Sequence, residues 1–251
     1  MDLVDATVAK ELHGHEVNPY AISVSYAKVP EGEGADEFHL RLAILDAYKE
    51  SVVDKVMSAG FEFINLRTPS LKLKAVRKEC TEVPLKDFAQ MFHGCPNDPS
   101  AQSEPLVKPT SRRIKLHFDS PTSFRSGGEY QIFPTPRLIL QSLAVKYAVL
   151  TGQDREIGDS ILESFAKSVR ISSYSLRTNF MPIEGVKIPA FIGTVTLSVH
   201  GSDTLKRHIR MLCEFGRYFG CGIKSSMGMG SLEVLREEQE VCAKCCSVFV
   251  A

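Results

Sequence analysis

The sequence has no excess of charge of either sign and no long apolar run. Among its 251 residues, 30 Lys and Arg balance 30 Asp and Glu, so no overall field points to a polyanionic partner, and any nucleic-acid site must be local. The apolar runs 138–140 and 144–150 are shorter than the roughly 20 residues that a membrane span needs. The acidic first residues also lack the basic and then apolar pattern of a signal peptide. We therefore expect a cytoplasmic protein outside the membrane.

Disulfide and metal-site motifs are equally scarce. The seven cysteines are odd in number and scattered, which argues against the disulfide framework of a secreted protein. A single Cys-x-x-Cys, from Cys242 to Cys245, lacks the second pair or the histidines that a structural zinc site needs. The signatures of metalloproteases, of esterases with a nucleophile elbow and of two-metal nucleases are missing as well. We expect no metal and no cofactor.

Alternating apolar and polar residues predict a mixed α+β protein with antiparallel pairings. In the first half we expect a short helix at 4–12, a helix over 48–58 that Asp46 caps and Gly60 ends, and strands at 18–26, 38–45, 61–66 and 71–76. Residues 95–110 contain four prolines and mark a domain boundary. The second half gives strand 113–118, helices 136–150 and 156–169, strands 171–178 and 191–199, a helix from its cap Asp203 to Gly216, and strand 231–235. This βαββαβ order is that of a ferredoxin-like unit.

Basic residues gather in the segments 65–78, 101–150 and 201–230. The first holds five basic residues and no acid, and the second includes Arg112, Arg113 and Lys115. Such runs are usually solvated faces, but three of them on one chain could instead line one groove. Sheets of this fold often bind single-stranded RNA across their open face, although the fold alone does not settle function.

A glycine-rich loop joins the last predicted helix to the last strand. Residues 220–230 hold four glycines and Lys224, a composition that lets backbone amides converge on an anion. Seen alone, the loop is more often a flexible connector, and it fits neither a P-loop nor a dinucleotide fingerprint because it leads into a strand. The segment 119–128, with Ser123 and Arg125, offers hydroxyls, amides and a guanidinium that suit a phosphate backbone, although a plain polar loop would look the same.

Two of the seven histidines, His13 and His15, follow a short helical run and precede Pro19 and Tyr20. Imidazole titrates near neutrality, so a histidine can take the 2′-hydroxyl proton of RNA or protonate a leaving 5′-oxygen without a metal. Taken alone, each is more commonly an ordinary surface or packed histidine, and the other five histidines carry no stronger signal.

Three segments together resemble the CRISPR-associated endoribonucleases of the Cas six type, members of the repeat-associated (RAMP) superfamily that cut precursor CRISPR RNA within its repeats. The loop 220–230 is similar to the carboxy-terminal glycine-rich signature of that family. Residues 120–125 with 133–138 are similar to its central motif, and Leu12-His13 followed by residues 18–23 to its catalytic segment. The resemblance covers nearly the whole chain.

The resemblance implies two tandem ferredoxin-like (RRM-like) domains, residues 1–100 without the opening strand and residues 110–240, before a tail at 241–251. It also implies metal-independent cleavage, in which a 2′-hydroxyl attacks the adjacent phosphate and leaves a 2′,3′-cyclic phosphate and a 5′-hydroxyl. His13 falls on the family's catalytic histidine, and His15 is the fallback. CRISPR repeat RNA is the implied partner. Association with other CRISPR effector subunits is left open, and we expect a monomer or a homodimer.

The candidate RNA-binding residues combine the basic runs with the two motifs. Asn18 stands where the family commonly has a lysine that stabilises phosphate charge, and asparagine offers only a neutral donor there. Lys28 or Arg41 could take over this role. The full set is Asn18, Lys28, Arg41, Arg112, Arg113, Lys115, Ser123, Arg125, Gly220, Gly222, Lys224, Ser225, Gly228 and Gly230.

Two other functions remain open from the sequence. A non-catalytic RNA-binding subunit of a CRISPR ribonucleoprotein would share the glycine-rich loop and the basic surface, and Asn18 favours it. A metabolic α+β enzyme whose loop binds a phosphorylated small molecule is also conceivable, but it leaves the basic runs and the central motif unexplained.

Overall fold

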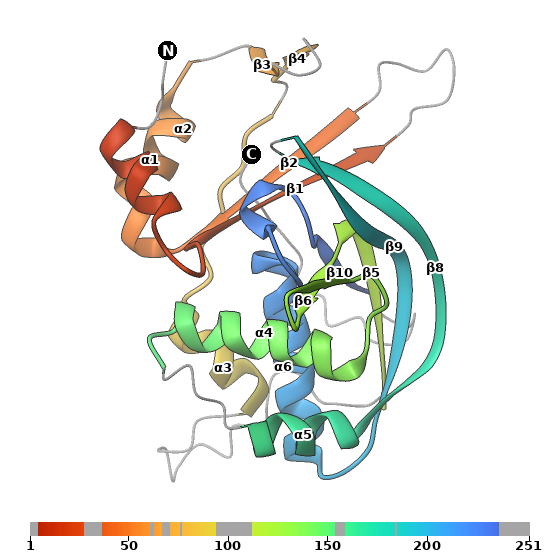
Figure 1. Cartoon of the computed structure of the whole chain (residues 1–251). Helices are drawn as coiled ribbons and strands as arrows, with labels where there is room; N and C mark the ends of the chain where they lie inside the picture. Colours follow the sequence, from red (N-terminus) through yellow and green to blue (C-terminus); the bar gives the residue numbers. More distant parts are fainter. Residues whose placement is uncertain are drawn as a thin grey trace, which may run out of the picture.

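The computed structural model describes residues 5–27, 37–60, 63–66, 71–75, 77–93, 112–153, 159–183 and 185–235 (Figure 1). The expected α+β class with antiparallel sheets is confirmed. The boundary segment 95–110, Lys28 and the tail at 241–251 lie outside the described residues.

The second half of the chain is built on a four-stranded antiparallel sheet in the order β10-β5-β9-β8. The last strand lies beside the first and the second strand forms the opposite edge, as in a ferredoxin-like unit, and helices α4 and α6 occupy the crossovers. Alternate residues of β5, such as Leu116 and Phe118, are buried under these helices. The bounds are β5 Arg113–Thr122, β6 Phe124–Ser126, β7 Glu129–Gln131, α4 Pro136–Leu150, α5 Asp159–Lys167, β8 Val169–Ile183, β9 Val186–Val199, α6 Asp203–Phe219 and β10 Leu232–Leu235.

The described part of the first half has the order helix, two strands, a composite helix, two strands and a further helix. Its first helix begins after Asp5, whose carboxylate accepts a hydrogen bond from the Thr7 amide at 2.7 Å. In the described part of this half, β1 pairs with β2 and β3 pairs with β4, which makes two separate hairpins. The bounds are α1 Ala6–His13, β1 Tyr20–Ala27, β2 Glu37–Ile44, β3 Phe63–Leu66, β4 Leu71–Lys74 and α3 Leu85–His93.

The helix predicted over 48–58 is composite, and the prediction that Asp46 caps it is wrong. Asp46 begins a 3₁₀ turn, η1 (Asp46–Tyr48), which passes into a π-helical turn, η2 (Lys49–Val53), and then into α2 (Asp54–Ser58). No side chain caps η1, and α2 ends two residues before Gly60. The wide π turn coincides with two consecutive buried valines, Val52 and Val53.

Helix α6 also differs from its prediction at both ends. Ser202, rather than Asp203, is the N-cap, and its hydroxyl accepts a hydrogen bond from the Leu205 amide at 3.3 Å. The helix runs through Gly216 and ends before Gly220, which has a φ of 70°. A Cβ at Gly216 would lie 2.6 Å from the side chain of Leu143 on α4, so this glycine permits close helix packing instead of ending the helix.

The two halves share one hydrophobic core. On α3, the Phe88 ring centroid lies 6.1 Å from that of Phe215 and 6.0 Å from that of Tyr218, both on α6. Ala21 of β1 belongs to the same buried cluster. Segments that the sequence analysis placed in the first domain therefore pack against the helices of the second, and the relative position of the halves is fixed by burial.

Candidate active site

His13 lies at the carboxy-terminal end of α1, where the first half meets the glycine-rich loop. Its Nδ1 is 2.9 Å from the hydroxyl of Tyr20, and Nε2 has no partner among the described residues. The Tyr20 ring is buried, which raises the pKa of its hydroxyl, and a hydrogen bond from Ser226 of the loop partly offsets this. Tyr20 therefore connects an exposed imidazole to the loop.

Asn18 forms a second connection between the two halves. Its side chain lies 2.7 Å from the Ser226 hydroxyl. With the amide nitrogen turned toward α1, it donates to the main-chain oxygens of Leu12 and His15 at 3.1 Å each, while its oxygen accepts from Ser226. Asn18 thus holds the end of α1 against residue 226, across 208 positions of sequence.

His15 has different surroundings, although it is only two residues from His13. Its Nε2 lies 3.1 Å from the hydroxyl of Tyr48, and that hydroxyl donates to the Glu11 carboxylate at 3.0 Å. This group of side chains is exposed, and within the described part of the chain it makes no hydrogen bond to the glycine-rich loop. The structure therefore connects the imidazole of His13, but not that of His15, to the loop through a tyrosine hydroxyl.

The glycines of the loop serve close approach between backbone segments. A Cβ on Gly230 would lie 2.1 Å from the carbonyl oxygen of Cys221, and one on Gly222 would lie 2.4 Å from that of Ser123. Both residues also have positive φ values, 73° and 89°, which favour glycine. The glycine amides donate within the protein: Gly220 to Gly216, Gly222 to Ser142, Gly228 to Ser225 and Gly230 to Pro121.

The backbone amides of the loop that lack an acceptor do not belong to its glycines. A short 3₁₀ turn, η3 (Ser225–Met227), follows Lys224, which adopts the left-handed conformation with φ 56°. Within the described part of the chain, no acceptor takes the amides of Lys224, Ser225 or Ser226. These three amides, rather than those of the glycines, are therefore available to an anion.

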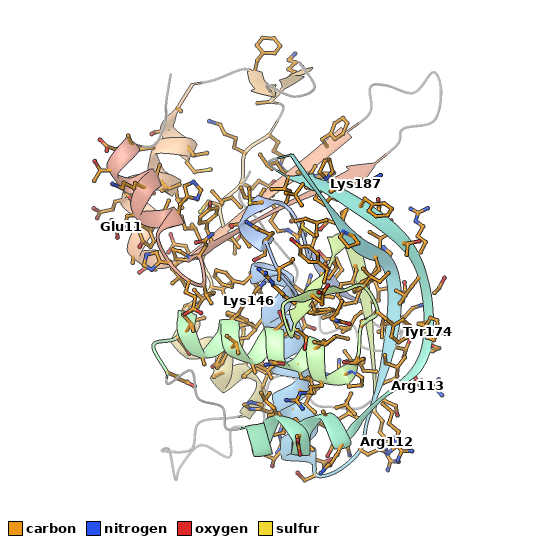
Figure 2. The ribbon with its side chains drawn as sticks, viewed as in Figure 1. Glu11, Arg112, Arg113, Lys146, Tyr174 and Lys187 are labelled. Carbon is orange, nitrogen blue, oxygen red and sulfur yellow. The ribbon has the colours of Figure 1, made fainter. Side chains whose placement is uncertain are left out.

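Lys146 lies beneath this loop on α4 and is buried (Figure 2). Its ammonium donates to the carbonyl oxygens of Phe219 and Gly220 at 3.1 and 3.2 Å and to the Ser225 hydroxyl at 3.0 Å. Burial lowers the pKa of Lys146 to about 8. The neighbouring Cys221 thiol has its pKa raised to about 11 by burial.

Two residues of the central motif have different roles in the structure. Ser123 is fully buried, and its carbonyl oxygen accepts from the Ile223 amide, so it supports the loop from below. Arg125 is exposed on β6, with Nε 3.4 Å from the carbonyl oxygen of Gly128.

The cationic start of β5 lies far from the glycine-rich loop. Arg112, Arg113 and Lys115 are exposed at one end of the strand, whereas the loop meets Pro121 and Ser123 at the other. Eight residues of extended chain separate Arg113 from Pro121, about 25 Å. The structure therefore does not bring these basic residues into the candidate active site.

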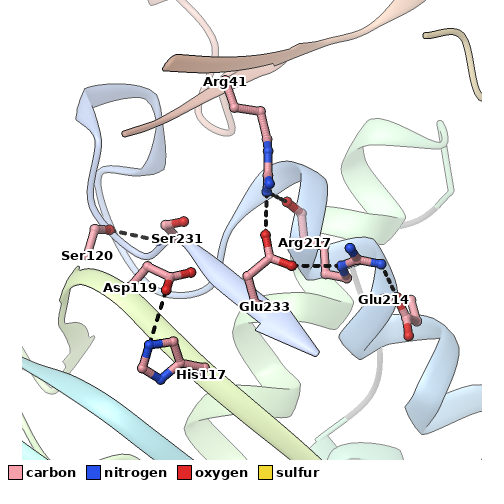
Figure 3. Close-up of polar contacts among 8 residues, drawn as sticks. All are labelled: Arg41, His117, Asp119, Ser120, Glu214, Arg217, Ser231 and Glu233. Carbon is pink, nitrogen blue, oxygen red and sulfur yellow. Dashed lines mark hydrogen bonds and ion pairs between the residues drawn. The ribbon is translucent and has the colours of Figure 1, made fainter. Parts of the chain in front are cut away.

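Arg41, the proposed substitute for the missing lysine, belongs to an ion-pair network that connects the halves (Figure 3). Its Nη1 lies 2.7 Å from Oε1 of Glu233 on β10, and Nε of Arg217 lies 3.1 Å from Oε2 of the same carboxylate. Nearby on β5, Nε2 of His117 lies 3.2 Å from Oδ1 of Asp119. Burial raises the pKa of Asp119 against the effect of His117.

Sequence reasoning missed Tyr20, Lys146 and Ser226 as members of the site. Of these residues, only Lys146 could have been recognised from the sequence, because it is the single charged residue within the apolar stretch 138–150. Ser226 carried no such signal, since its contact with Asn18 spans 208 positions of sequence. Among the described residues there is no group of three or more His, Cys, Asp or Glu side chains that could hold a metal, and no helix long and apolar enough to cross a membrane.

Comparisons with known proteins agree with this architecture. The family model of the CRISPR-associated endoribonuclease Cas6 matches residues 116–232. The Cas6 endoribonuclease of Mycobacterium tuberculosis is 31% identical over 235 residues, 93% of this chain and 68% of that protein. That of Streptococcus thermophilus is 30% identical over 234 residues, 93% of this chain and 87% of that protein. A solved Cas6 product complex shares the fold, with a TM-score of 0.69 at 21% identity, covering 91% of this chain and 87% of the other. The resemblance seen in the sequence is thus confirmed, and the chain belongs to the CRISPR-associated endoribonuclease Cas6 family.

Proposed function

We propose that this protein binds CRISPR repeat RNA and cleaves precursor CRISPR RNA into guide units, with His13 as the acid or base. Its curated relatives are named CRISPR-associated endoribonucleases, which supports the class of reaction. The observation that carries the proposal is the junction of His13, Tyr20 and Ser226, where an exposed imidazole meets a loop with unused amides.

The proposed chemistry is an internal transfer of the phosphodiester. The 2′-oxygen forms a bond to the adjacent phosphorus, the bond from phosphorus to the 5′-oxygen breaks, and the products are a 2′,3′-cyclic phosphate and a 5′-hydroxyl. One proton leaves the 2′-hydroxyl and one reaches the 5′-oxygen. Because Nδ1 of His13 faces Tyr20, the free Nε2 is the atom that would give or take one of these protons. No step requires a metal.

The turn that follows Lys224 would stabilise the phosphate as charge develops on it. Its unused amides are donors held in place before the reaction, which is the arrangement that favours charged transition states. Lys224 itself is exposed and adds a cation at the same turn. Asn18 is occupied by Leu12, His15 and Ser226, and in this proposal it positions α1 instead of contacting phosphate.

The test is a cleavage assay in EDTA with repeat RNA, unrelated RNA, and repeat RNA carrying a 2′-deoxy nucleotide at the cleavage position. We expect only the unmodified repeat to be cut, with cyclic-phosphate ends. The change His13→Ala should slow cleavage by roughly 10²- to 10⁴-fold while RNA affinity stays within about twofold. Cleavage that needs added Mg²⁺, or cleavage of the 2′-deoxy substrate, would contradict the mechanism.

A second candidate function is a binding subunit that does not cut. The neutral side chain of Asn18 favours it, because this position supplies no cation to the phosphate. Tight binding of intact repeat RNA by the wild type, with no product after long incubation, would support this function over the nuclease.

A further inference from the structure

Lys146 is a buried cation whose role the reaction does not explain. It lies on α4 between apolar neighbours, and among the described residues no carboxylate forms an ion pair with it. Burying a charge without an opposite charge is unfavourable unless hydrogen bonds satisfy it. All three hydrogen-bond acceptors of the Lys146 ammonium lie in one short segment, from Phe219 to Ser225.

Those acceptors define what the ammonium holds together. The carbonyl oxygens of Phe219 and Gly220 lie at the end of α6, where a helix leaves its last carbonyls without partners. The hydroxyl of Ser225 belongs to the turn whose amides are unused, and the next residue, Ser226, contacts Asn18 and Tyr20. Lys146 therefore ties the end of α6 to the turn that contacts Tyr20, the hydrogen-bond partner of His13.

We propose that Lys146 is a positioning residue for RNA binding: its ammonium holds the segment 219–225 so that the amides of residues 224–226 face the RNA phosphate beside His13. This proposal rests on the proposed function, because it assigns a phosphate to that turn. It requires no contact between Lys146 and RNA.

The proposal makes RNA affinity depend on the proton of Lys146. With its pKa lowered to about 8 by burial, the side chain is charged at pH 7 and mostly neutral at pH 9. A neutral amine has two hydrogens for three acceptors and no positive charge, so the turn loses support as pH rises. The facing titratable group is the Cys221 thiol on the loop, which stays neutral in this range because burial raises its pKa to about 11. The Ser225 hydroxyl, which accepts from the ammonium, does not titrate in this range.

The experiment measures the Kd of uncleavable 2′-deoxy repeat RNA at pH 7, 8 and 9 and constant ionic strength. We expect the wild-type Kd to rise about three- to tenfold between pH 7 and 9, because the fraction of the protein with a charged Lys146 and a supported turn falls. Lys146→Met should bind more weakly at pH 7 and show a flat profile. The control Lys167→Met changes an exposed lysine on α5 and should behave like the wild type. If Lys146 contributed only to the stability of the fold, the Kd of the variant would not become independent of pH.

Circular dichroism checks that each variant is folded, and Lys146→Gln, which still donates two hydrogen bonds, replaces Lys146→Met if that variant unfolds. A folded variant at Lys146 with wild-type affinity at pH 7, or one whose Kd rises with pH as the wild-type value does, overturns this proposal alone. If the wild type does not bind repeat RNA at any pH, the proposed function fails and this proposal fails with it.

Discussion

At the scale of single residues, the role of a side chain depends more on the residues that it contacts than on its own amino-acid type. His13 and His15 are the same amino acid two positions apart. The side chain of the first contacts Tyr20, which also meets Ser226 of the glycine-rich loop, whereas the side chain of the second contacts Tyr48, which donates to Glu11. Arg41 and Ser123 were predicted to bind RNA, but the structure uses the guanidinium of one in an ion pair and buries the other.

Replacing the two tyrosines separates the histidines by experiment. Tyr20→Phe keeps the buried ring but removes the hydroxyl that orients His13, so we expect the single-turnover cleavage rate to fall about tenfold with KM nearly unchanged. Tyr48→Phe removes the partner of His15 and should leave the rate within about twofold. A larger loss in Tyr48→Phe than in Tyr20→Phe would transfer the catalytic role to His15.

At the scale of elements, the glycine-rich loop is a packed unit and not a flexible connector. Its backbone passes within contact distance of Ser123 and of its own other end, Cys221 against Gly230, and Lys146 fills the space beneath it. The close approach explains why glycines are needed, and the exposed turn at Lys224 explains which amides remain for a ligand.

Two glycines that both have positive φ values, Gly228 (89°) and Gly230 (73°), provide a matched pair of variants. Gly230→Ala would place a Cβ 2.1 Å from the Cys221 carbonyl oxygen, whereas Gly228→Ala meets nothing within 4 Å. Alanine at either position would have to adopt a positive φ, which destabilises the folded state by about 1–2 kcal/mol. We expect urea denaturation to show a loss of about 1 kcal/mol in the free energy of unfolding for Gly228→Ala and roughly 3 kcal/mol or more for Gly230→Ala. Equal losses would mean that conformation alone, and not close approach, requires glycine.

At the scale of the whole molecule, the two halves are joined by a shared core and by one ion-pair network. Phe88 of α3 packs between Phe215 and Tyr218, and Arg41 of β2 reaches Glu233 on β10 (Figure 3). Since His13 belongs to one half and the glycine-rich loop to the other, their alignment depends on these contacts. The site exists only in the assembled molecule.

A double-mutant cycle measures the contribution of the network. Glu233 accepts from both Arg41 and Arg217, so Glu233→Gln leaves two guanidinium groups facing each other, whereas Arg41→Met leaves Glu233 still paired with Arg217. We therefore expect Glu233→Gln to lower the free energy of unfolding more than Arg41→Met does. The coupling energy between residues 41 and 233 should be about 0.5–2 kcal/mol, since both side chains are about a quarter exposed. Strict additivity of the two changes would show that this pair does not hold the halves together.

The strands and helices could be predicted from the sequence because the patterns that indicate them lie in contiguous residues. Alternation along 191–199 and the apolar face of 203–219 depend on neighbouring residues, and both elements are found. The end of α6 was misjudged because Gly216 looks like a helix terminator, and only the packing against Leu143 shows why a glycine stands there.

The sequence by itself determined the fold class, the family and the positions of His13 and the loop 220–230, because periodicity and motifs are properties of contiguous residues. The tertiary structure decided that the side chain of His13, rather than that of His15, is linked to the loop through Tyr20, that Lys146 supports the loop, and that Arg41 pairs with Glu233. These contacts join residues 7 to 192 positions apart, and the burial that fixes them arises only when the two halves share a core.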